Sequence, residues 1–157
     1  MKKIPEVHQQ LNQVGNQNPT MKGMGCTFTG FWYYSGQFYF IHVGDSRLYR
    51  LRGKYIAQLT RDHSLQKMLN NASIPANHIG NCFGGGVSAF FYDFENLHDR
   101  VLPEDTFLLC SDGLNGELED EVMEELLLSG SAAGGLVAKA NELGGRDNIS
   151  CLVVRVG

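Results

Sequence analysis

The sequence predicts an α+β domain built on antiparallel sheet, and three observations support this class. Several short segments rich in Phe, Tyr, Ile and Val come early in the chain, separated by Ser-Gly, Gly-Asp and Arg-Gly turns. Two segments with helical periodicity follow them, and one apolar segment closes the chain. Strands first, then helices, then a strand are typical of α+β domains with antiparallel sheet.

The first half of the chain is predicted to hold two helices and four strands. Residues 5–20 are rich in Gln and Asn, and the stripe of Val7, Leu11 and Val14 predicts a short helix that ends near Gly15. The four strands form an antiparallel meander at 26–34, 37–43, 46–51 and 55–60. Asp62 and Ser64 then precede a short apolar run, which predicts a capped helix that ends at 70–71.

The second half begins with a loop that ends in Gly84–Gly86. Strands are predicted at 87–92 and 106–111, with a turn at 103–105 before the second. Helical periodicity covers 118–128 and 132–143, and acidic residues crowd the first turn of the former. A strand at 148–156 completes the prediction.

Composition limits the class of protein and its partners. The 157 residues, 43% of them hydrophobic, suffice for one compact domain, 1–157, with one core. A net charge of −4 without a run of Lys or Arg argues against a nucleic-acid partner. The apolar runs are too short to span a bilayer, so no membrane association is expected. Four scattered cysteines without a Cys-x-x-Cys pair indicate a reducing, cytoplasmic protein without structural zinc or disulfides.

Two aspartates are the strongest candidates for a functional site. Asp112 ends a predicted buried strand, and Asp147 comes just before the last one. Hard divalent cations such as Mg²⁺ or Mn²⁺ take oxygen ligands, and short Asp side chains at rigid strand ends can supply them. Asp-Gly and Arg-Asp-Asn are also ordinary turn sequences, so turn chemistry is the alternative interpretation.

Other polar residues carry weaker signals. Asp45, between two predicted strands, is interpreted as a residue of a tight turn. His63 is interpreted as a capping or surface residue at a helix start. Ser111 lacks the Gly-x-Ser-x-Gly frame of a serine hydrolase and has no evident His partner.

Five short segments, in order along the chain, favour a metal site over ordinary turn chemistry at Asp112 and Asp147. They are Gly25–Thr27, Val43–Arg47, Leu59–Ser64, Cys110–Leu114 and Gly145–Ile149. Together they resemble consecutive motifs of the metal-dependent protein serine/threonine phosphatases, the protein phosphatase 2C-like family. The resemblance extends from about residue 5 to the C-terminus. It implies an antiparallel β-sandwich flanked by helices, in α-β-β-α layers, with Mg²⁺ or Mn²⁺ ions at one end.

The resemblance also implies roles for three carboxylates. In the family, the residues that match Asp112 and Asp147 are metal ligands, and the residue that matches Asp62 helps to bind a further, weaker metal. The reaction needs no protein nucleophile. Metal ions share a water, lower its pKa and direct it at the phosphorus of a phosphoserine or phosphothreonine.

Other motifs of the family have no match in this sequence. They are a phosphate-binding Arg, an Asn-Glu-Asp segment, and a strand that ends in Asp-Gly-Met-Gly-Gly-His and supplies the metal-bridging Asp. Lys22–Gly25 shares Gly-Met-Gly with that strand, but a polar segment with Pro19 precedes it. We therefore expect a phosphatase 2C-like domain that is incomplete at the N-terminus, with weak or no metal binding and little phosphatase activity in this chain alone.

Two functions remain open at this point. One is a phosphatase acting on phosphoproteins, whose first strands are lost, removed or supplied by another polypeptide. The other is a pseudophosphatase, a module that binds phosphorylated or regulatory partners without hydrolysing them. Retention of all three aspartates favours the former, and the unmatched upstream motifs favour the latter. Exposed sheet edges further predict a symmetric homodimer.

Overall fold

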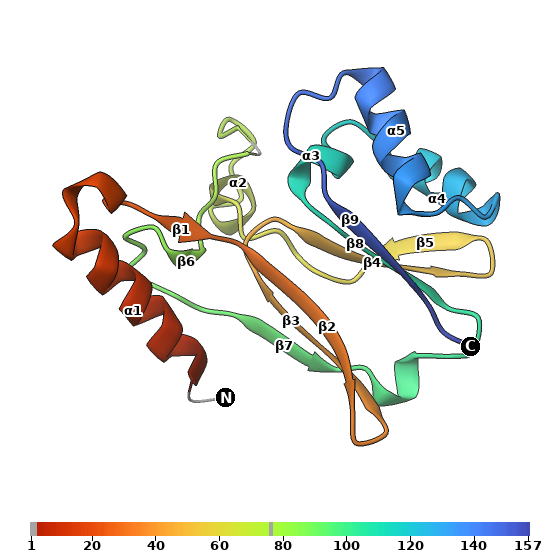
Figure 1. Ribbon diagram of the computed structural model, residues 1–157, viewed down its shortest axis with the longest axis horizontal. Helices are drawn as coiled ribbons and strands as arrows, with labels where there is room; N and C mark the ends of the chain where they lie inside the picture. The colour runs from red at the N-terminus through yellow and green to blue at the C-terminus, as the bar shows by residue number, and fades with distance from the viewer. Residues whose placement is uncertain (1–2, 76) are drawn as a thin grey trace. The chain divides into compact units, whose positions relative to one another are not determined.

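The computed structural model describes residues 3–75 and 77–157. These residues divide into two compact units. The first comprises residues up to 35, 39–45 and 62–96, and the second comprises 36–38, 46–61 and 97–157. Figure 1 shows the elements of both units.

The first unit holds one long helix, two short helical turns and five strands. Its helical elements are α1 (Lys3–Gln17), the 3-10 turn η1 (Pro19–Met21) and α2 (Leu65–Met68). Its strands are β1 (Gly25–Cys26), β2 (Phe28–Tyr34), most of β3 (Gln37–Val43), β6 (Phe83–Gly84) and β7 (Asp93–Asn96). Strands β2, β3 and β7 form one sheet with β3 in the centre, and β1 pairs with β6.

Helix α1 lies beside the β1–β6 pair, as Figure 1 shows. The predicted helix is confirmed, but its buried face is displaced from the predicted stripe. His8 and Gly15 are the buried residues, whereas Val7 and Val14 are 44% and 39% exposed. The helix therefore packs through a polar ring and a glycine, which apolar periodicity does not reveal.

The second unit is a four-stranded antiparallel sheet covered by helices. Its strands are β4 (Arg47–Arg52), β5 (Tyr55–Gln58), β8 (Thr106–Cys110) and β9 (Cys151–Arg155), in the spatial order β5-β4-β8-β9. Its helical elements are the 3-10 turn η2 (His98–Arg100), α3 (Asp112–Asn115), α4 (Asp120–Leu128) and α5 (Ala133–Leu143). Figure 1 shows α3, α4 and α5 gathered on one side of this sheet.

The core of the second unit lies between the sheet and these helices. Tyr49 and Leu108 from the central strands are fully buried, and so are Met123 from α4 and Leu136 from α5. Helices α4 and α5 confirm the two predicted helices. Each contributes an apolar stripe to the core. Glu124 of α4 is half-buried, and its Oε2 accepts from the Ile56 amide at 2.8 Å.

The α+β class is confirmed, because helices accompany antiparallel sheets. The single meander is wrong. Strands β3 and β4 follow one another in the chain but belong to different sheets. Gly44 stands between them with φ of +113°, and a Cβ there would lie 2.3 Å from the Thr27 side chain. A turn that requires glycine thus redirects the chain into a new sheet.

The predicted strand at 87–92 is also wrong. Strand β7 begins at Asp93, and the preceding residues form no ladder. The side chain of Asn81 bonds this backbone instead, since its Nδ2 donates to the Phe91 carbonyl at 2.9 Å. Its Oδ1 accepts from the Phe91 amide at 3.5 Å. A side chain thus satisfies the groups that a neighbouring strand would otherwise bond.

The last strand is shorter than predicted, because residues 148–150 belong to a loop and β9 begins at Cys151. Among the helices of the described residues, none combines the length and apolar composition needed to cross a bilayer.

Candidate metal site

Asp112 is the first helical residue after β8. Strand β8 is buried along most of its length, and Ser111 then takes an extended conformation as the residue that caps α3. The Asp112 side chain is half-buried. Within residues 3–75 and 77–157, its carboxylate has no hydrogen-bond or ion-pair partner. A half-buried carboxylate without a protein partner is available to a cation.

Asp147 lies in the loop between α5 and β9, and its side chain is exposed. One carboxylate oxygen, Oδ1, accepts a hydrogen bond from the Asn148 amide at 2.7 Å. Asp147 therefore does take part in local turn chemistry. A carboxylate has about four acceptor sites, so this bond leaves capacity for a cation.

Ser111 holds the Asp147 loop against the end of β8. Its amide donates to the Ser150 carbonyl at 2.9 Å, and its hydroxyl donates to the Asn148 carbonyl at 3.2 Å. The same hydroxyl accepts from the Ser150 amide at 3.0 Å. These three bonds bring the segments of Asp112 and Asp147 together. The residues around Ser111 in the sequence do not predict this role.

Gly113 allows the two segments to approach this closely. A Cβ at this position would lie 2.3 Å from the carbonyl oxygen of Asn148 and 3.0 Å from its carbonyl carbon. A side chain cannot occupy that space unless the loop moves. Packing against the loop therefore requires glycine at the position after Asp112.

Glu117 and Arg146 form a second link to the same loop. The Arg146 Nε donates to Glu117 Oε1 at 2.8 Å, its Nη2 donates to Oε2 at 3.2 Å, and its amide donates to Oε1 at 3.1 Å. These bonds and the guanidinium charge lower the pKa of the Glu117 carboxyl. Only 5% of the Glu117 side chain is exposed. The link fixes the residue that precedes Asp147.

Asp62 belongs to the first unit, where it is half-buried just before α2. The predicted cap of that helix is confirmed, because the Ser64 hydroxyl accepts from the Lys67 amide at 3.3 Å. Asp112 and Asp147 belong to the second unit, so the meeting of all three carboxylates stays a prediction.

The interpretation of His63 as a capping or surface residue is wrong, since it is 4% exposed. Its Nδ1 accepts from the Gly44 amide at 3.3 Å and from the Asn81 amide group at 2.9 Å. The proton therefore lies on Nε2, which donates to Asp93 at 3.1 Å. His63 is a buried link between segments, and it anchors the backbone beside Asp62.

The donor chemistry suits a hard divalent cation, because Asp112 and Asp147 offer only oxygen. Their number does not suffice for a tight site. Among the described residues, no group of three or more His, Cys, Asp or Glu side chains is placed to hold a metal ion. Since Mg²⁺ takes about six oxygen ligands, two carboxylates fit a weakly held ion whose remaining ligands are water.

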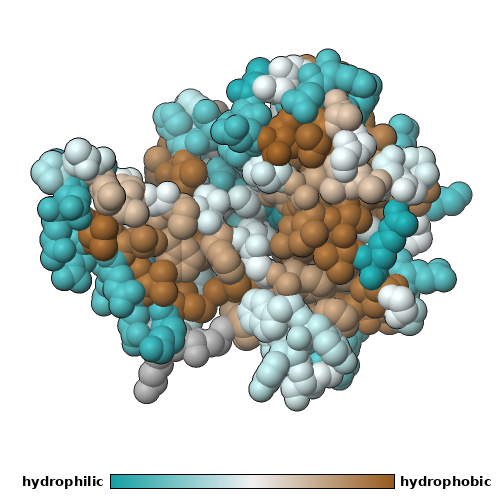
Figure 2. Space-filling view, viewed as in Figure 1, coloured by the Kyte–Doolittle hydropathy of each residue, from teal (hydrophilic) through white to brown (hydrophobic). Residues whose placement is uncertain are grey.

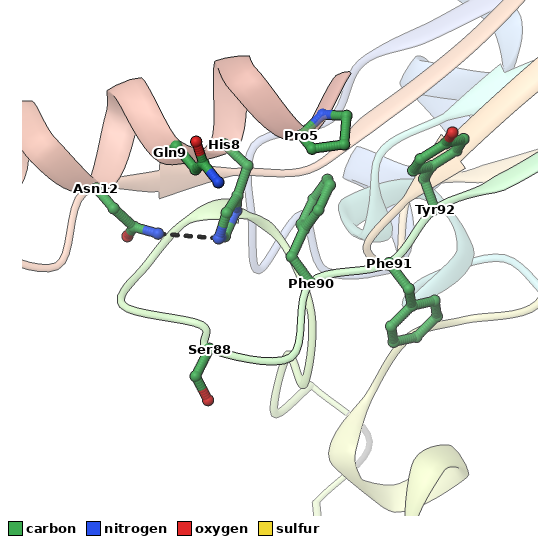
Figure 3. Close-up of a pocket in the computed structure, with 8 residues that line it drawn as sticks. All are labelled: Pro5, His8, Gln9, Asn12, Ser88, Phe90, Phe91 and Tyr92. Carbon is green, nitrogen blue, oxygen red and sulfur yellow. Dashed lines mark hydrogen bonds between the residues drawn. The ribbon is translucent and has the colours of Figure 1, made fainter. Parts of the chain in front are cut away.

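A separate cavity of about 570 Å³ lies in the first unit, between α1 and the segment before β7 (Figure 3). None of the three aspartates borders it. Its lining residues are Pro5, His8, Gln9, Asn12, Ser88, Phe90, Phe91 and Tyr92.

His8 is the organising residue of this cavity. Its ring stacks on Phe90 with centroids 4.2 Å apart. Nδ1 accepts from the Gly84 amide at 3.2 Å, and Nε2 lies 3.0 Å from the Val87 carbonyl oxygen and 2.9 Å from the Asn12 Nδ2, the contact drawn in Figure 3. The apolar residues of α1 do not predict that His8 contacts the residues of this cavity.

Comparison with known proteins identifies homologues of the chain. No family model matches it. The serine/threonine phosphatase Stp of Listeria welshimeri is 33% identical over 164 residues, a match that covers 98% of this chain and 65% of the relative. The protein phosphatase PhpP of Streptococcus pneumoniae is 32% identical over 162 residues, with 94% and 64% covered. The chain is a homologue of these serine/threonine phosphatases. It spans about 65% of the length of these curated relatives.

Solved structures of phosphatase family members agree in fold. PppA, described as a regulatory component of the type VI secretion system in Pseudomonas aeruginosa, superposes with a TM-score of 0.81 at 33% identity. That match covers 96% of this chain and 66% of PppA. The catalytic domain of the phosphatase PstP in complex with 2 manganese ions gives a TM-score of 0.76 at 26% identity, with 96% and 67% covered.

Proposed function

We propose that this chain carries part of a metal-dependent protein serine/threonine phosphatase. The observation that carries the proposal is the half-buried Asp112 carboxylate, which has no hydrogen-bond or ion-pair partner in the described part of the chain and lies beside the Asp147 loop. In this proposal Asp112 and Asp147 hold Mg²⁺ or Mn²⁺, and Asp62 contributes to a further metal position. A bound metal would supply an activated water for hydrolysis of phosphoserine or phosphothreonine in a phosphoprotein.

The residues around the aspartates have supporting roles. Ser111 fixes the distance between the β8 end and the Asp147 loop through its three hydrogen bonds. Glu117 and Arg146 fix the start of that loop. Such supporting bonds orient metal ligands and reduce the entropy lost on binding.

The same proposal includes low or absent activity for this chain alone. No residue of the sequence matches the metal-bridging Asp or the phosphate-binding Arg of the family motifs. Without a bridging carboxylate, two metal ions have no shared protein ligand, and their repulsion is not offset. A pseudophosphatase that binds phosphorylated or regulatory partners is the second candidate, and these unmatched motifs favour it.

Calorimetric titration with Mn²⁺ tests the metal site directly. We expect weak binding to the native chain, loss of that binding in Asp112→Asn, and no loss in Asp99→Asn. The control removes one carboxylate charge at a side chain that is 94% exposed. Equal binding by all three proteins would reject Asp112 as a ligand.

Turnover of p-nitrophenyl phosphate tests the activity. We expect a rate near background with Mn²⁺, so a manganese-dependent rate that Asp112→Ala abolishes would contradict the expected low activity. A separate polypeptide that carries the upstream family motifs should restore manganese-dependent turnover if the chain is part of an enzyme. Binding of a phosphopeptide without any turnover in the reconstituted mixture would favour the pseudophosphatase.

We further propose that exposed sheet edges pair two chains into a symmetric dimer. Strands β2 and β7 flank one sheet, and β5 and β9 flank the other. Figure 2 shows hydrophobic surface over β8 and β9 and beside α1. Trp32 on β2 is 39% exposed, and Leu152 on β9 is 57% exposed. Light scattering over a range of concentrations tests this, and a monomer at the highest concentration would refute it.

A further inference from the structure

Two cysteines face each other across the β8–β9 pair. Cys110, the last residue of β8, is the direct partner of Cys151, the first residue of β9. The Ser111 amide bonds the Ser150 carbonyl at 2.9 Å, and the Val156 amide bonds the Asp105 carbonyl at 2.9 Å. These bonds mark the hydrogen-bonded positions of the ladder.

Hydrogen-bonded and non-hydrogen-bonded positions alternate along an antiparallel pair. Cys110 and Cys151 come one residue before Ser111 and one after Ser150, so they occupy a non-hydrogen-bonded position. Cα atoms at such a position are about 4.5 Å apart. This spacing lies at the short end of the range that a disulfide spans, about 4.4–6.8 Å.

The side chains of directly opposed residues project from the same face of a sheet. Here that face is the one covered by helices, because both cysteines belong to the core between the sheet and α3–α5. Cys110 Sγ lies 3.8 Å from Asn115 Oδ1 in α3, and Cys151 Sγ lies 3.4 Å from the Ala133 carbonyl in α5. These S–H hydrogen bonds are weak, and they must be given up for the sulfurs to turn toward each other.

We propose that Cys110 and Cys151 form a reversible disulfide that ties β8 to β9. A small-molecule disulfide such as oxidised glutathione is the oxidant. One protein thiolate attacks it, which forms a mixed disulfide and releases one glutathione thiol; the second protein thiol then displaces the other. Two protein S–H bonds are lost, one S–S bond forms, and the oxidant leaves as two thiols with both protons.

The position of Cys151 on β9, an edge strand, gives the oxidant access. Cys151 is only partly buried, whereas Cys110 is 5% exposed. Burial raises the pKa of the Cys151 thiol, so its reaction is slow at neutral pH and faster in mild alkali. Exposed disulfides are the more readily reduced ones, and β9 is an edge strand. In a reducing compartment the bond between Cys110 and Cys151 is therefore transient.

The other two cysteines, both in the first unit, lack this alignment. Cys26 on β1 faces Phe83 on β6, and Cys82 precedes Phe83 in the chain. Burial and the nearby Cys26 thiol raise the pKa of the Cys82 thiol, so these two cysteines lie near each other without being directly opposed in a ladder. Serine at both positions gives a background in which Cys110 and Cys151 hold the remaining thiols.

The test is intact-mass measurement of the Cys26→Ser/Cys82→Ser variant after incubation with oxidised glutathione at mildly alkaline pH. We expect a monomer that has lost two hydrogen atoms, a cross-linked pair of peptides containing Cys110 and Cys151, and full reversal by dithiothreitol. Oxidation should also raise the unfolding temperature. Adding Cys151→Ser, or Cys151→Val as an apolar replacement, should abolish the loss of hydrogen. Two thiols that remain alkylatable after incubation of the folded background protein, or a mass loss that survives replacement of Cys151, would overturn the proposal.

Discussion

Replacement of Gly113 by alanine should separate the two segments that carry Asp112 and Asp147. The added Cβ would lie 2.3 Å from the Asn148 carbonyl oxygen. Since non-bonded carbon atoms are normally about 3.5 Å or more from their neighbours, the loop must retreat by roughly 1 Å. Overpacking of this kind costs about 1–3 kcal/mol.

Part of this cost is offset, because Gly113 is a residue of α3 and alanine favours a helix by up to about 1 kcal/mol. We therefore expect Gly113→Ala to lower the free energy of unfolding by about 1–2 kcal/mol. Mn²⁺ affinity should fall as well, because the loop that retreats carries Asp147.

Gly134→Ala is the matched control. Gly134 lies in α5, and a Cβ there would meet no atom within 4 Å. Alanine should stabilise this helix by up to about 1 kcal/mol. Urea-induced unfolding followed by far-ultraviolet circular dichroism compares the two variants, and amide exchange at 147–150 locates the change. A Gly113→Ala protein as stable as the native chain, with unchanged exchange in the loop, would refute the close-approach argument.

Two further predictions concern the second unit. Leu136→Ala should lower the free energy of unfolding by about 3–4 kcal/mol, because Leu136 is fully buried in the core. Leu143 lies on the same helix and is 53% exposed, so Leu143→Ala should change the free energy of unfolding by less than about 0.5 kcal/mol in the same urea assay. Asp105 is 1% exposed. Burial alone would raise the pKa of Asp105, but hydrogen bonds from Arg52 and the Leu102 amide, with the nearby positive charge, hold the pKa below its usual value. The ionised form of Asp105 therefore stabilises the fold at pH values above the unfolded pKa of about 3.9. This stability is lost as the pH falls through the lower native pKa. Asp105→Asn should therefore flatten the acid side of a plot of unfolding temperature against pH.

The sequence predicted elements well where the local pattern matched the packing. Strands β4 and β8 and helices α4 and α5 have apolar periodicity that agrees with their buried faces. The grouping of strands into sheets was not predictable in the same way. It depends at Gly44 on a turn conformation and on the proximity of Thr27, which is 17 residues earlier in the chain.

The aromatic run before β7 shows a second limit. Phe90 and Phe91 have high strand propensity, yet they line a cavity, and Asn81 bonds the Phe91 backbone. His63 shows the same limit for polar residues. Its neighbours in sequence suggested a cap, but its partners Gly44 and Asn81 are 18 or more residues away. Long-range hydrogen bonds determine the backbone conformation at Phe91 and the buried position of His63.

The Asp112 motif was recognisable from the sequence, but its supporting residues were not. The residues next to Ser111 argue against a nucleophile and indicate no other role, yet its three hydrogen bonds hold the loop. Glu117 follows a glycine in an ordinary acidic stretch, and nothing in that stretch predicts its link to Arg146. A residue that positions another is visible only after the chain has folded.

Folding and metal binding place different requirements on the three residues of the Ser111–Gly113 segment. Ser111 and Gly113 join the loop to the sheet, so folding alone requires them in an active or an inactive protein. The Asp112 carboxylate makes no hydrogen bond or ion pair within the described residues, and partial burial of an unpaired charge costs stability. Asp112→Asn should therefore leave the metal-free protein as stable as before, or more stable, while metal binding is lost. A clear loss of stability in the metal-free variant would instead assign Asp112 a structural role at the start of α3 and would remove the main support for the metal site.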